Sequence, residues 1–472
     1  MKLSISDQLN FAELSRDYNP LHIDRVRARR YIFGEPVAHG LNVVLLAMSA
    51  YLKRVEGPQG IATLKCRFIK PIYLEKFFTF DFKNKAGLQE DVRIDVLQSS
   101  EVKIRLEFQL NPAHSTVPSI NFDEDSHHWP VKPENFSLDQ LGGYRGKTRC
   151  GIDPDLVLKV YGKHLVNAIG LTQISELISY SRIVGMHSPG LNSIFSELIL
   201  ERNSKKREPE VSFGVESIDE RFNLVNVYAS GPCFDAKLRA FYRPLQVQQR
   251  STQEMKAHLR QDEFKGIRAL VVGGSRGLGE LAAKCLGFGG ADLMVTYFKG
   301  RSDASKIVDD IKNYNPNVKM CSLDVLRISD TDLEAIKHFD PTHTFYFATP
   351  FIFDGVKGQF SEERYAKFKR YYVSAFELIV ESLAKQGVQE KCFFYPSSVA
   401  IDDEPSDMRE YVLAKKNGEH LCAQLETRHR NISIFKPRLP RLATDQTVSL
   451  ASVKNNDPIA LLEFIRHTAG KV

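Results

Sequence analysis

The middle of the chain holds the segment that most restricts its fold, where an apolar run turns into a glycine-rich loop and then a helix. Residues 267–274 read IRALVVGG, and a short β-branched run of this kind is typical of a buried strand. The loop over residues 273–279 reads GGSRGLG, and helical periodicity follows as far as Phe288. Glycines at a strand-to-helix turn let the backbone turn tightly and approach a phosphate group closely.

Strands and helices continue to alternate from this loop onward. The expected strands read ADLMVTYF, KMCSLDV, THTFYFATP, CFFYPSS and ISIFKPR, and they are accompanied by helical patterns over residues 278–288, 304–314, 360–386 and 408–426. Strands separated by helices of this length predict βαβ units and a parallel sheet. We therefore expect residues 264–472 to form an α/β Rossmann domain with a doubly wound parallel sheet.

The glycine loop predicts a dinucleotide site, because free N–H groups and a partial positive charge at a helix start stabilise a pyrophosphate. The next strand ends in YFKGR, with Lys299 and Arg301 where NAD-binding enzymes carry an acidic residue. Basic side chains there, together with Arg276, neutralise a 2′-phosphate and favour NADPH as the cofactor. The expected cofactor contacts are Gly273, Ser275, Arg276, Gly277, Leu278, Gly279, Lys299 and Arg301.

A possible catalytic set follows in the same block. Lys415 comes four positions after Tyr411, so on a helix both side chains share one face, and Ser398 ends the preceding strand. A phenol has a pKa of about 10, and we expect the nearby ammonium to lower the pKa of Tyr411, which makes it a usable proton donor. Ser398 would then hold a substrate carbonyl.

Residues 264–472 resemble a short-chain dehydrogenase/reductase through VVGGSRGLG, LDV at 323–325, YPSS and YVLAK. The resemblance implies that Tyr411 is the acid, that Lys415 binds the cofactor ribose and tunes Tyr411, and that Asp324 lies near the adenine. It implies that Ser398 polarises the carbonyl.

The sequence departs from that family at four places. Val272 replaces a threonine, residues 346–349 replace an NNAG segment, Tyr371 lies near the place of an asparagine, and Pro437 is followed by Arg438. These departures concern the proton relay more than cofactor binding.

The first 112 residues have a different pattern. A helix is expected near residues 6–17 and an apolar helix over residues 41–53, followed by the alternating runs IATLKCRFIKPIYL, FFTFDFKN, VRIDVLQSS and VKIRLEFQL. Period-two alternation predicts antiparallel strands, and one central helix with several strands predicts an α+β layer in which a sheet wraps a helix.

A second block repeats this order. We interpret residues 113–146 as a linker or crossover, since they are rich in Pro, Ser, Asn and Asp. In residues 147–245 a helical region over 154–184 precedes the strands FSELILERN, EVSFGVESIDE, LVNVYAS and AKLRAFYRP. Residues 246–263 form a polar linker to the third block.

A second candidate site lies near the N-terminus. Asp17 and His22 flank the turn-forming pair Asn19-Pro20, and a carboxylate beside an imidazole can move protons in opposite directions. His39 and Gly40 come where the apolar helix begins, and a backbone N–H there can stabilise a developing oxyanion. Taken singly, a surface Asp and a structural His are the plainer interpretation.

The combined strings SRDYNPLH and AHGL resemble the MaoC-like dehydratases, or (R)-specific enoyl hydratases, with Arg16 in place of a common glycine. The resemblance implies a hot-dog fold, Asp17 and His22 as the groups that handle water, and Gly40 as an oxyanion donor. It also implies acyl thioesters of coenzyme A or acyl carrier protein as substrates. The second block lacks the motif, so we expect a silent half that completes a double hot-dog.

These parts together favour a bifunctional β-ketoacyl thioester reductase and 3-hydroxyacyl thioester dehydratase in fatty-acid or polyketide biosynthesis. Two alternatives stay open: enoyl hydration followed by 3-hydroxyacyl oxidation in breakdown, or an active dehydratase with a degenerate dinucleotide-binding module. Other copies of the chain are further candidate partners, since both kinds of domain often associate.

The composition excludes other classes. A net charge of +6, spread along 472 residues, predicts no nucleic-acid partner, and no apolar stretch predicts a membrane segment or a signal peptide. Seven cysteines occur without a CxxC pair, which predicts reduced thiols in a cytoplasmic protein and no metal site.

Overall fold

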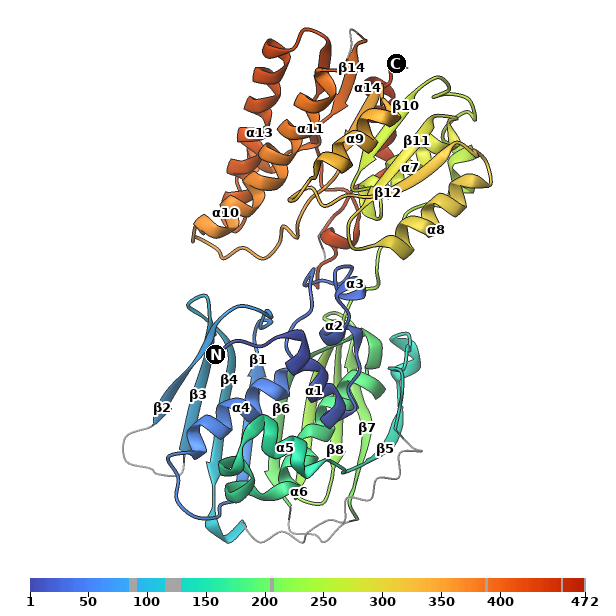
Figure 1. Cartoon of the computed structure of the whole chain (residues 1–472). Helices are drawn as coiled ribbons and strands as arrows, with labels where there is room; N and C mark the ends of the chain where they lie inside the picture. The colour runs from blue at the N-terminus through green and yellow to red at the C-terminus, as the bar shows by residue number, and fades with distance from the viewer. Residues whose placement is uncertain (85–90, 115–128, 204–207, 387–388, 451–452, 471–472) are drawn as a thin grey trace. The chain divides into compact units, whose positions relative to one another are not determined.

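The fold was taken from a computed structural model that describes residues 1–84, 91–114, 129–203, 208–386, 389–450 and 453–470. The chain forms two compact units, Met1–Leu245 and Gln246–Val472 (Figure 1). Within the described residues, every helix is too short or too polar to cross a bilayer.

The first unit is built on a nine-stranded sheet in the order β2-β3-β4-β1-β6-β9-β8-β7-β5, with antiparallel pairing throughout. The strands are β1 (Ile61–Phe68), β2 (Phe78–Asn84), β3 (Asp91–Gln98), β4 (Glu101–Leu110), β5 (Arg145–Arg149), β6 (Ser193–Arg202), β7 (Glu210–Asp219), β8 (Leu224–Ser230) and β9 (Phe234–Tyr242). The order of β6 to β9 mirrors that of β1 to β4, and the two sets meet where β1 pairs with β6. Two similar halves therefore share one continuous sheet.

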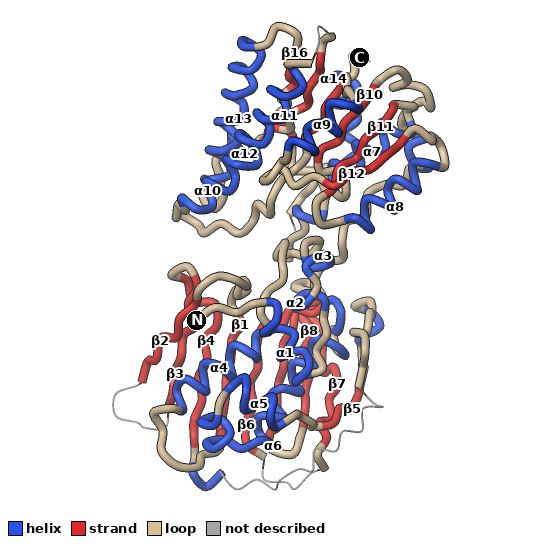
Figure 2. The backbone as a smooth tube through the Cα atoms, in the orientation of Figure 1, coloured by secondary structure: helices blue, strands red, loops and turns tan. Residues whose placement is uncertain are grey.

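The helices of this unit are α1 (Ile5–Ser15), α2 (Pro20–Ile23), α3 (Arg25–Ala28), α4 (Gly40–Leu52), α5 (Pro154–Tyr161) and α6 (Lys163–Arg182). Of these, α1, α4, α5 and α6 lie on one face of the sheet, with α4 and α6 packed against each other (Figures 1 and 2). Burial alternates along strands such as β9, which is why period-two patterns identified them. One apolar core unites both halves and includes Met48 of α4 and Ile178 of α6.

The sequence predictions for this unit needed two corrections. The helical region expected over residues 154–184 is interrupted twice, because Gly162 has a φ of 76° between α5 and α6 and Gly170 has a φ of 73° at a kink inside α6; a π-helical turn (Ile183–His187) follows α6. Strand β5 begins inside the segment interpreted as a linker, because its sequence RGKTR has no apolar residue and buries only Thr148. Residues 115–128 of that linker lie outside the described residues.

The second unit contains the parallel sheet that the sequence predicted. The strands β10 (Arg268–Val272), β11 (Asp292–Tyr297), β12 (Val318–Ser322), β13 (His343–Tyr346), β14 (Lys391–Phe394) and β16 (Ile432–Phe435) run in the order β12-β11-β10-β13-β14-β16. Every pair is parallel. Numbered from β10, this is the 3-2-1-4-5-6 order of a Rossmann fold. Two short strands, β15 (Ser397–Ser398) after β14 and β17 (Arg438–Leu439) after β16, form a separate parallel pair.

The helices of the second unit are α7 (Gly277–Phe288), α8 (Arg301–Lys312), α9 (Asp330–Phe339), α10 (Glu362–Lys369), α11 (Ala375–Ala384), α12 (Ala400–Asp403), α13 (Arg409–Arg428) and α14 (Leu461–Thr468). Separate apolar clusters fill the two faces of the sheet. The single long helix expected over residues 360–386 is in fact α10 and α11 joined by a π-helical turn (Arg370–Ser374). Carboxyl ends of parallel strands, where ligands bind in such folds, meet at one edge of this sheet.

Candidate functional sites

Asp17 lies in the loop after α1, where Arg16 adopts a left-handed φ of 57° and turns the chain inward. Its side chain is buried, with a relative exposure of 2%. The Ser181 hydroxyl donates to Asp17 Oδ2 at 2.7 Å, and the Asn19 N–H donates to Asp17 Oδ1 at 3.2 Å. Both carboxylate oxygens therefore have a fixed direction.

His22 lies on the short helix α2, which Asn19 caps through its side chain and Pro20 starts. The ring atom Nδ1 of His22 is 2.8 Å from the carbonyl oxygen of Val37, so in the neutral ring Nδ1 carries the proton and donates it. The other ring nitrogen, Nε2, is then an acceptor. This tautomer suits a general base.

Burial changes the pKa of both groups in a useful way. Desolvation raises the pKa of Asp17, although His22 and the hydrogen bond from Ser181 oppose the rise. Desolvation lowers the pKa of His22, and the charge of Asp17 opposes that fall. Both shifts oppose the charged forms of the two side chains, which suits a pair that exchanges protons with a substrate.

His39 contacts both His22 and Asp17. Its ring stacks on that of His22 with centroids 3.9 Å apart, and its Nε2 lies 3.1 Å from the backbone oxygen of Asp17. Its Nδ1 and its backbone N–H both contact Gln8 Oε1, at 3.0 and 2.8 Å. The backbone N–H of His39 is therefore already used, and the oxyanion role expected for this turn is left to Gly40.

Gly40 is the first residue of α4, where helix N–H groups lack intrahelical partners. A Cβ added at Gly40 would lie 2.5 Å from Phe68 Cε1, so a larger residue would displace the start of the helix. The N–H of Gly40 has no hydrogen-bond partner among the described residues. It is thus available to a substrate oxygen.

The second half of the unit builds much of this site. The Asn19 amide donates to the carbonyl oxygens of Gly185 and Gly190, both at 3.1 Å. A Cβ at Gly185 would lie 2.2 Å from Asp17 Oδ1, so only glycine permits this approach of the π-helical turn. Gly185 did not stand out in the sequence, because no motif marks it and its partners Asp17 and Asn19 are distant along the chain.

Asp17, His22 and His39 also offer ligand atoms within 4.8 Å of one another, a spacing that suits a divalent metal. Coordination by His39 would break a hydrogen bond, since both of its ring nitrogens face protein oxygens. The tautomer of His22 and the donors on Asp17 fit proton transfer better.

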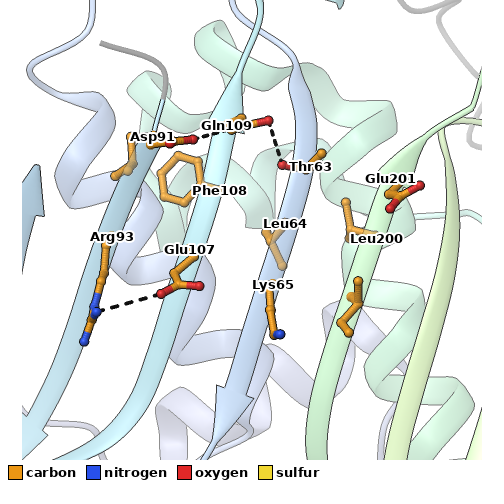
Figure 3. A pocket seen from close by; sticks show the side chains of 12 residues that line it. Thr63, Leu64, Lys65, Asp91, Arg93, Glu107, Phe108, Gln109, Leu200 and Glu201 are labelled. Atoms are coloured by element: carbon orange, nitrogen blue, oxygen red, sulfur yellow. Dashed lines mark hydrogen bonds and ion pairs between the residues drawn. The ribbon is translucent and has the colours of Figure 1, made fainter. Parts of the chain in front are cut away.

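A separate hollow of about 330 Å³ lies on the sheet over β3, β4, β1 and β6 (Figure 3). Its rim carries paired polar groups, such as Arg93 with Glu107 at 4.0 Å and Gln109 with Asp91 at 2.7 Å. None of the predicted site residues lines it. It has no group arranged for chemistry.

In the second unit, the glycine loop is shaped to receive a phosphate. A Cβ at Gly273 would lie 2.8 Å from the backbone nitrogen of Ala348, and one at Gly279 would lie 2.3 Å from Gly273 O. Arg276 is the N-cap of α7 but makes no side-chain cap bond, so the first N–H groups of the helix are left for a ligand. Ser275 and Leu278 lie in the same turn. The loop therefore fits the pyrophosphate of a dinucleotide.

The residues expected around the adenosine end lie after β11 and β12. Lys299 and Arg301 are exposed beyond the carboxyl end of β11, and Phe298 beside them is 50% exposed. Asp324 follows β12, and its Oδ1 accepts the Leu326 N–H at 3.0 Å. Lys299, which lies over the ring of Phe298, and Arg301 place two positive charges just after β11, and such charges suit a 2′-phosphate.

The structure brings Ser398 and Tyr411 close together, since β15 packs against α13 and Ser398 acts on the pKa of Tyr411. The expected lowering of the Tyr411 pKa by Lys415 is wrong: burial raises the pKa of Tyr411, and only the bond from Ser398 opposes the rise. Burial also lowers the pKa of Lys415 to about 7. Both groups lose hydration that would stabilise their charged forms, so each is held toward neutrality.

Lys415 is held by groups that the sequence did not reveal. Its ammonium donates to the carbonyl oxygen of Pro396 at 2.6 Å and lies 4.0 Å from the ring centroid of Tyr372. Tyr372, in the π-helical turn, also hydrogen-bonds Thr349 at 2.5 Å. Tyr371, which lies near the place of the family's asparagine, offers its backbone oxygen to the hydroxyl of Tyr346 at 2.6 Å.

The N-terminal segment of the chain is similar to known proteins. Residues 1–99 match the family model described as MaoC like domain. This segment is a MaoC-like domain. A 3-hydroxybutyryl-CoA dehydratase from Methylorubrum extorquens is 37% identical to this chain over 97 residues, which is 21% of this chain and 55% of that protein. The match thus spans about half the length of this curated relative.

Solved structures are similar to part of the chain at low identity. An oxidoreductase from Escherichia coli, yciK, has a TM-score of 0.41 at 14% identity, over 45% of this chain and 92% of its own. A short chain dehydrogenase from E. coli CFT073 complexed with NADPH has a TM-score of 0.41 at 13% identity, over 45% and 93%. The landomycin C-6 ketoreductase LanV, with bound NADP and rabelomycin, has a TM-score of 0.39 at 18% identity, over 45% and 91%.

The MaoC-like domain contains Asp17, His22, His39 and Gly40, but part of their support comes from outside it. Ser181, Gly185 and Gly190 all follow the matched residues and belong to the second half of the unit. The arrangement of the site therefore depends on the whole first unit.

Proposed function

We propose that this protein is a bifunctional enzyme that reduces β-ketoacyl thioesters with NADPH and dehydrates the resulting 3-hydroxyacyl thioesters. The observation that carries the proposal is the union in one chain of a buried Asp17–His22 pair and a Ser398–Tyr411 pair. The first pair suits the removal of water, and the second suits the protonation of a carbonyl. The product of one reaction is the substrate of the other.

In the dehydration, one member of the Asp17–His22 pair takes a proton from C2 of the thioester while the other gives a proton to the departing hydroxyl group. The C2–H and C3–O bonds break, a C2–C3 double bond forms, and water leaves. The N–H of Gly40 stabilises the negative charge that develops on the thioester oxygen. The dipole of α4 adds to this effect, since its positive end lies at Gly40.

In the reduction, the Ser398 hydroxyl holds the ketone oxygen and Tyr411 donates the proton that this oxygen needs. NADPH, when bound, supplies the hydride for C3. We propose that the glycine loop holds its pyrophosphate, that Lys299, Arg301 and Arg276 hold the 2′-phosphate, and that Asp324 lies near the adenine. Lys415, fixed against Tyr372, would bind the ribose.

We also propose that the first unit is a double hot-dog with one active half. Supporting this, each half provides a central helix and four strands, and the strand orders mirror each other across β1 and β6. The silent half then has a supporting role, through Ser181 and the turn after α6. The biosynthetic direction is favoured by the two cations after β11, which suit NADPH.

A second candidate is a hydratase whose second unit binds a dinucleotide without reducing a ketone. One observation favours it: Lys415 is buried against tyrosine rings, and its pKa falls to about 7.

The deciding experiment follows NADPH absorbance with acetoacetyl-CoA, and hydration of crotonyl-CoA in parallel. We expect the wild type to do both, Tyr411→Phe to lose only reduction, and His22→Ala to lose only hydration. Hydration without NADPH consumption by the wild type would favour the second candidate. Hydration that survives His22→Ala and Asp17→Asn would overturn the first site.

A further inference from the structure

The segment Ala348–Ser361, between β13 and α10, is not used by the chemistry proposed above. It begins against the glycine loop, because Ala348 N would be 2.8 Å from a Cβ on Gly273. Its sequence runs ATPFIFDGVKGQFS, with the apolar stretch Phe351–Phe353 near its start. It leaves β13 at the carboxyl edge of the sheet, where ligands bind in parallel α/β folds.

The far end of this segment is fastened beside the catalytic tyrosine. Arg364 donates to Asp354 Oδ1 and to Glu410 Oε2, both at 2.8 Å, and to the oxygen of Ile352 at 2.7 Å. Glu410 precedes Tyr411 and accepts the Ser361 N–H at 2.6 Å. The segment therefore spans from the cofactor loop to the start of α13 with both ends anchored.

A third contact joins the middle of the segment to Arg441, just after β17. The guanidinium of Arg441 lies 4.9 Å from the ring centroid of Phe353. Arg441 follows β17 by two residues, and β17 pairs with β15 so that Leu439 lies opposite Ser398. Phe353 and Phe351, whose rings are 6.2 Å apart, thus lie among the elements that carry Ser398 and Tyr411.

Phe351 and Phe353 are only half-buried, whereas Ile352 between them packs against the apolar core. Half-exposed aromatic rings on a segment that Arg364 fastens to Glu410, the residue before Tyr411, offer apolar surface to the substituents of a carbonyl bound at Tyr411. In a β-ketoacyl thioester, one substituent of the ketone is the thioester arm and the other is the acyl chain. An aliphatic acyl chain matches these rings.

We propose that Phe351 and Phe353 form the wall that binds the acyl chain, so that the second unit prefers medium-length aliphatic β-ketoacyl thioesters over acetoacetyl thioesters. This proposal rests on the proposed function of the second unit. The rings contribute binding energy in proportion to the methylene groups they cover. Arg364 fixes the wall relative to Tyr411.

The test compares 3-oxooctanoyl-CoA with acetoacetyl-CoA for the wild type, Phe351→Ala and Phe353→Ala. Loss of contact with a few methylene groups should lower kcat/KM for 3-oxooctanoyl-CoA about tenfold in each variant. For acetoacetyl-CoA we expect a change of less than about twofold. Phe360→Ala, an exposed phenylalanine at the other end of the segment, is the matched control and should leave both values unchanged.

Calorimetric titration of 3-oxooctanoyl-CoA into the NADP⁺-loaded protein gives a readout that needs no turnover. The same two variants should weaken this binding about tenfold while the affinity for NADP⁺ stays the same. Equal decreases in kcat/KM for both substrates, or unchanged affinity for 3-oxooctanoyl-CoA, would show that Phe351 and Phe353 do not bind the acyl chain. If the wild type binds 3-oxooctanoyl-CoA but oxidises no NADPH, the proposed reduction fails while the wall stands.

Discussion

The hydroxyl of Ser181 donates a hydrogen bond of 2.7 Å to Asp17 Oδ2, although 164 residues separate the two along the chain. Ser181 lies near the end of α6, in the half of the first unit that lacks its own Asp–His pair. The half that lacks the pair thus supports the half that carries it, and the geometry of Asp17 depends on both halves.

Ser181→Ala should lower kcat for crotonyl-CoA hydration about ten- to hundredfold, since a hydrogen bond to a charged group contributes roughly 1.5–3 kcal/mol. Because the bond from Ser181 lowers the pKa of Asp17, its loss should also move the acid limb of the pH profile to higher pH. Ser179→Ala is the control, as that hydroxyl bonds to Glu176 O within α6. Equal effects of the two changes on kcat would refute a specific role for Ser181.

Asp17→Asn should abolish hydration and yet stabilise the first unit. Burial raises the folded-state pKa of Asp17, so the ionised form is less favourable in the folded than in the unfolded chain at neutral pH. Asparagine removes this penalty, and a gain on the order of 1 kcal/mol would raise Tm by about 2–4 °C. Calorimetry at several pH values checks the sign: the advantage should shrink as pH falls through the raised pKa. A lower Tm for Asp17→Asn at pH 7 contradicts this account.

Lys299→Glu and Arg301→Glu should each weaken NADPH binding at least about tenfold, because each places a negative charge beside the 2′-phosphate. NADH lacks that phosphate, so its affinity should change little or improve. Fluorescence titration of both cofactors measures this, with Lys306→Glu on the exposed face of α8 as the control. A parallel loss of NADH and NADPH affinity would indicate damage to the loop instead.

The reduction should slow above a pH of about 7, where Lys415 loses its proton. Tyr411 does not cause this limb, since burial raises its pKa and keeps it protonated. Profiles of kcat/KM for acetoacetyl-CoA report groups of the free enzyme. The Lys415→Met variant should reduce acetoacetyl-CoA slowly and should not show the fall in kcat/KM above a pH of about 7. The control Lys416→Met, which removes an exposed partner of Glu404, should still show this fall. A limb that persists in Lys415→Met belongs to another group.

Arg364→Met should lower kcat for reduction about tenfold without changing NADPH affinity, since Arg364 holds Glu410 next to Tyr411 and does not contact the glycine loop. Removing a buried cation leaves Glu410 unpaired, so Arg364→Met with Glu410→Gln is measured too. Arg428→Met, at the other end of α13 and paired with Glu381, is the control. Loss of NADPH binding in the double variant would mean a general structural role.

Local patterns were sufficient for much of the fold. Alternating runs identified the strands of the first unit, and the glycine loop with its flanking apolar runs predicted the parallel sheet, because burial on one or two faces leaves a mark on the residues themselves. Strand β5 escaped, since its five residues bury only Thr148. The interruption of the long helix at Arg370–Ser374 also escaped, because no proline or glycine marks it.

The sequence by itself determined which chemical groups this protein carries: Asp17 with His22 near one end, and Ser398, Tyr411 and Lys415 after a glycine loop. Only the tertiary structure decided their environment. The bond from Ser181 to Asp17, the contact of Lys415 with Tyr372, and the raised pKa of Tyr411 all depend on residues brought together by packing. Motifs record covalent neighbours, whereas pKa values follow from burial and from partners that lie far apart along the chain.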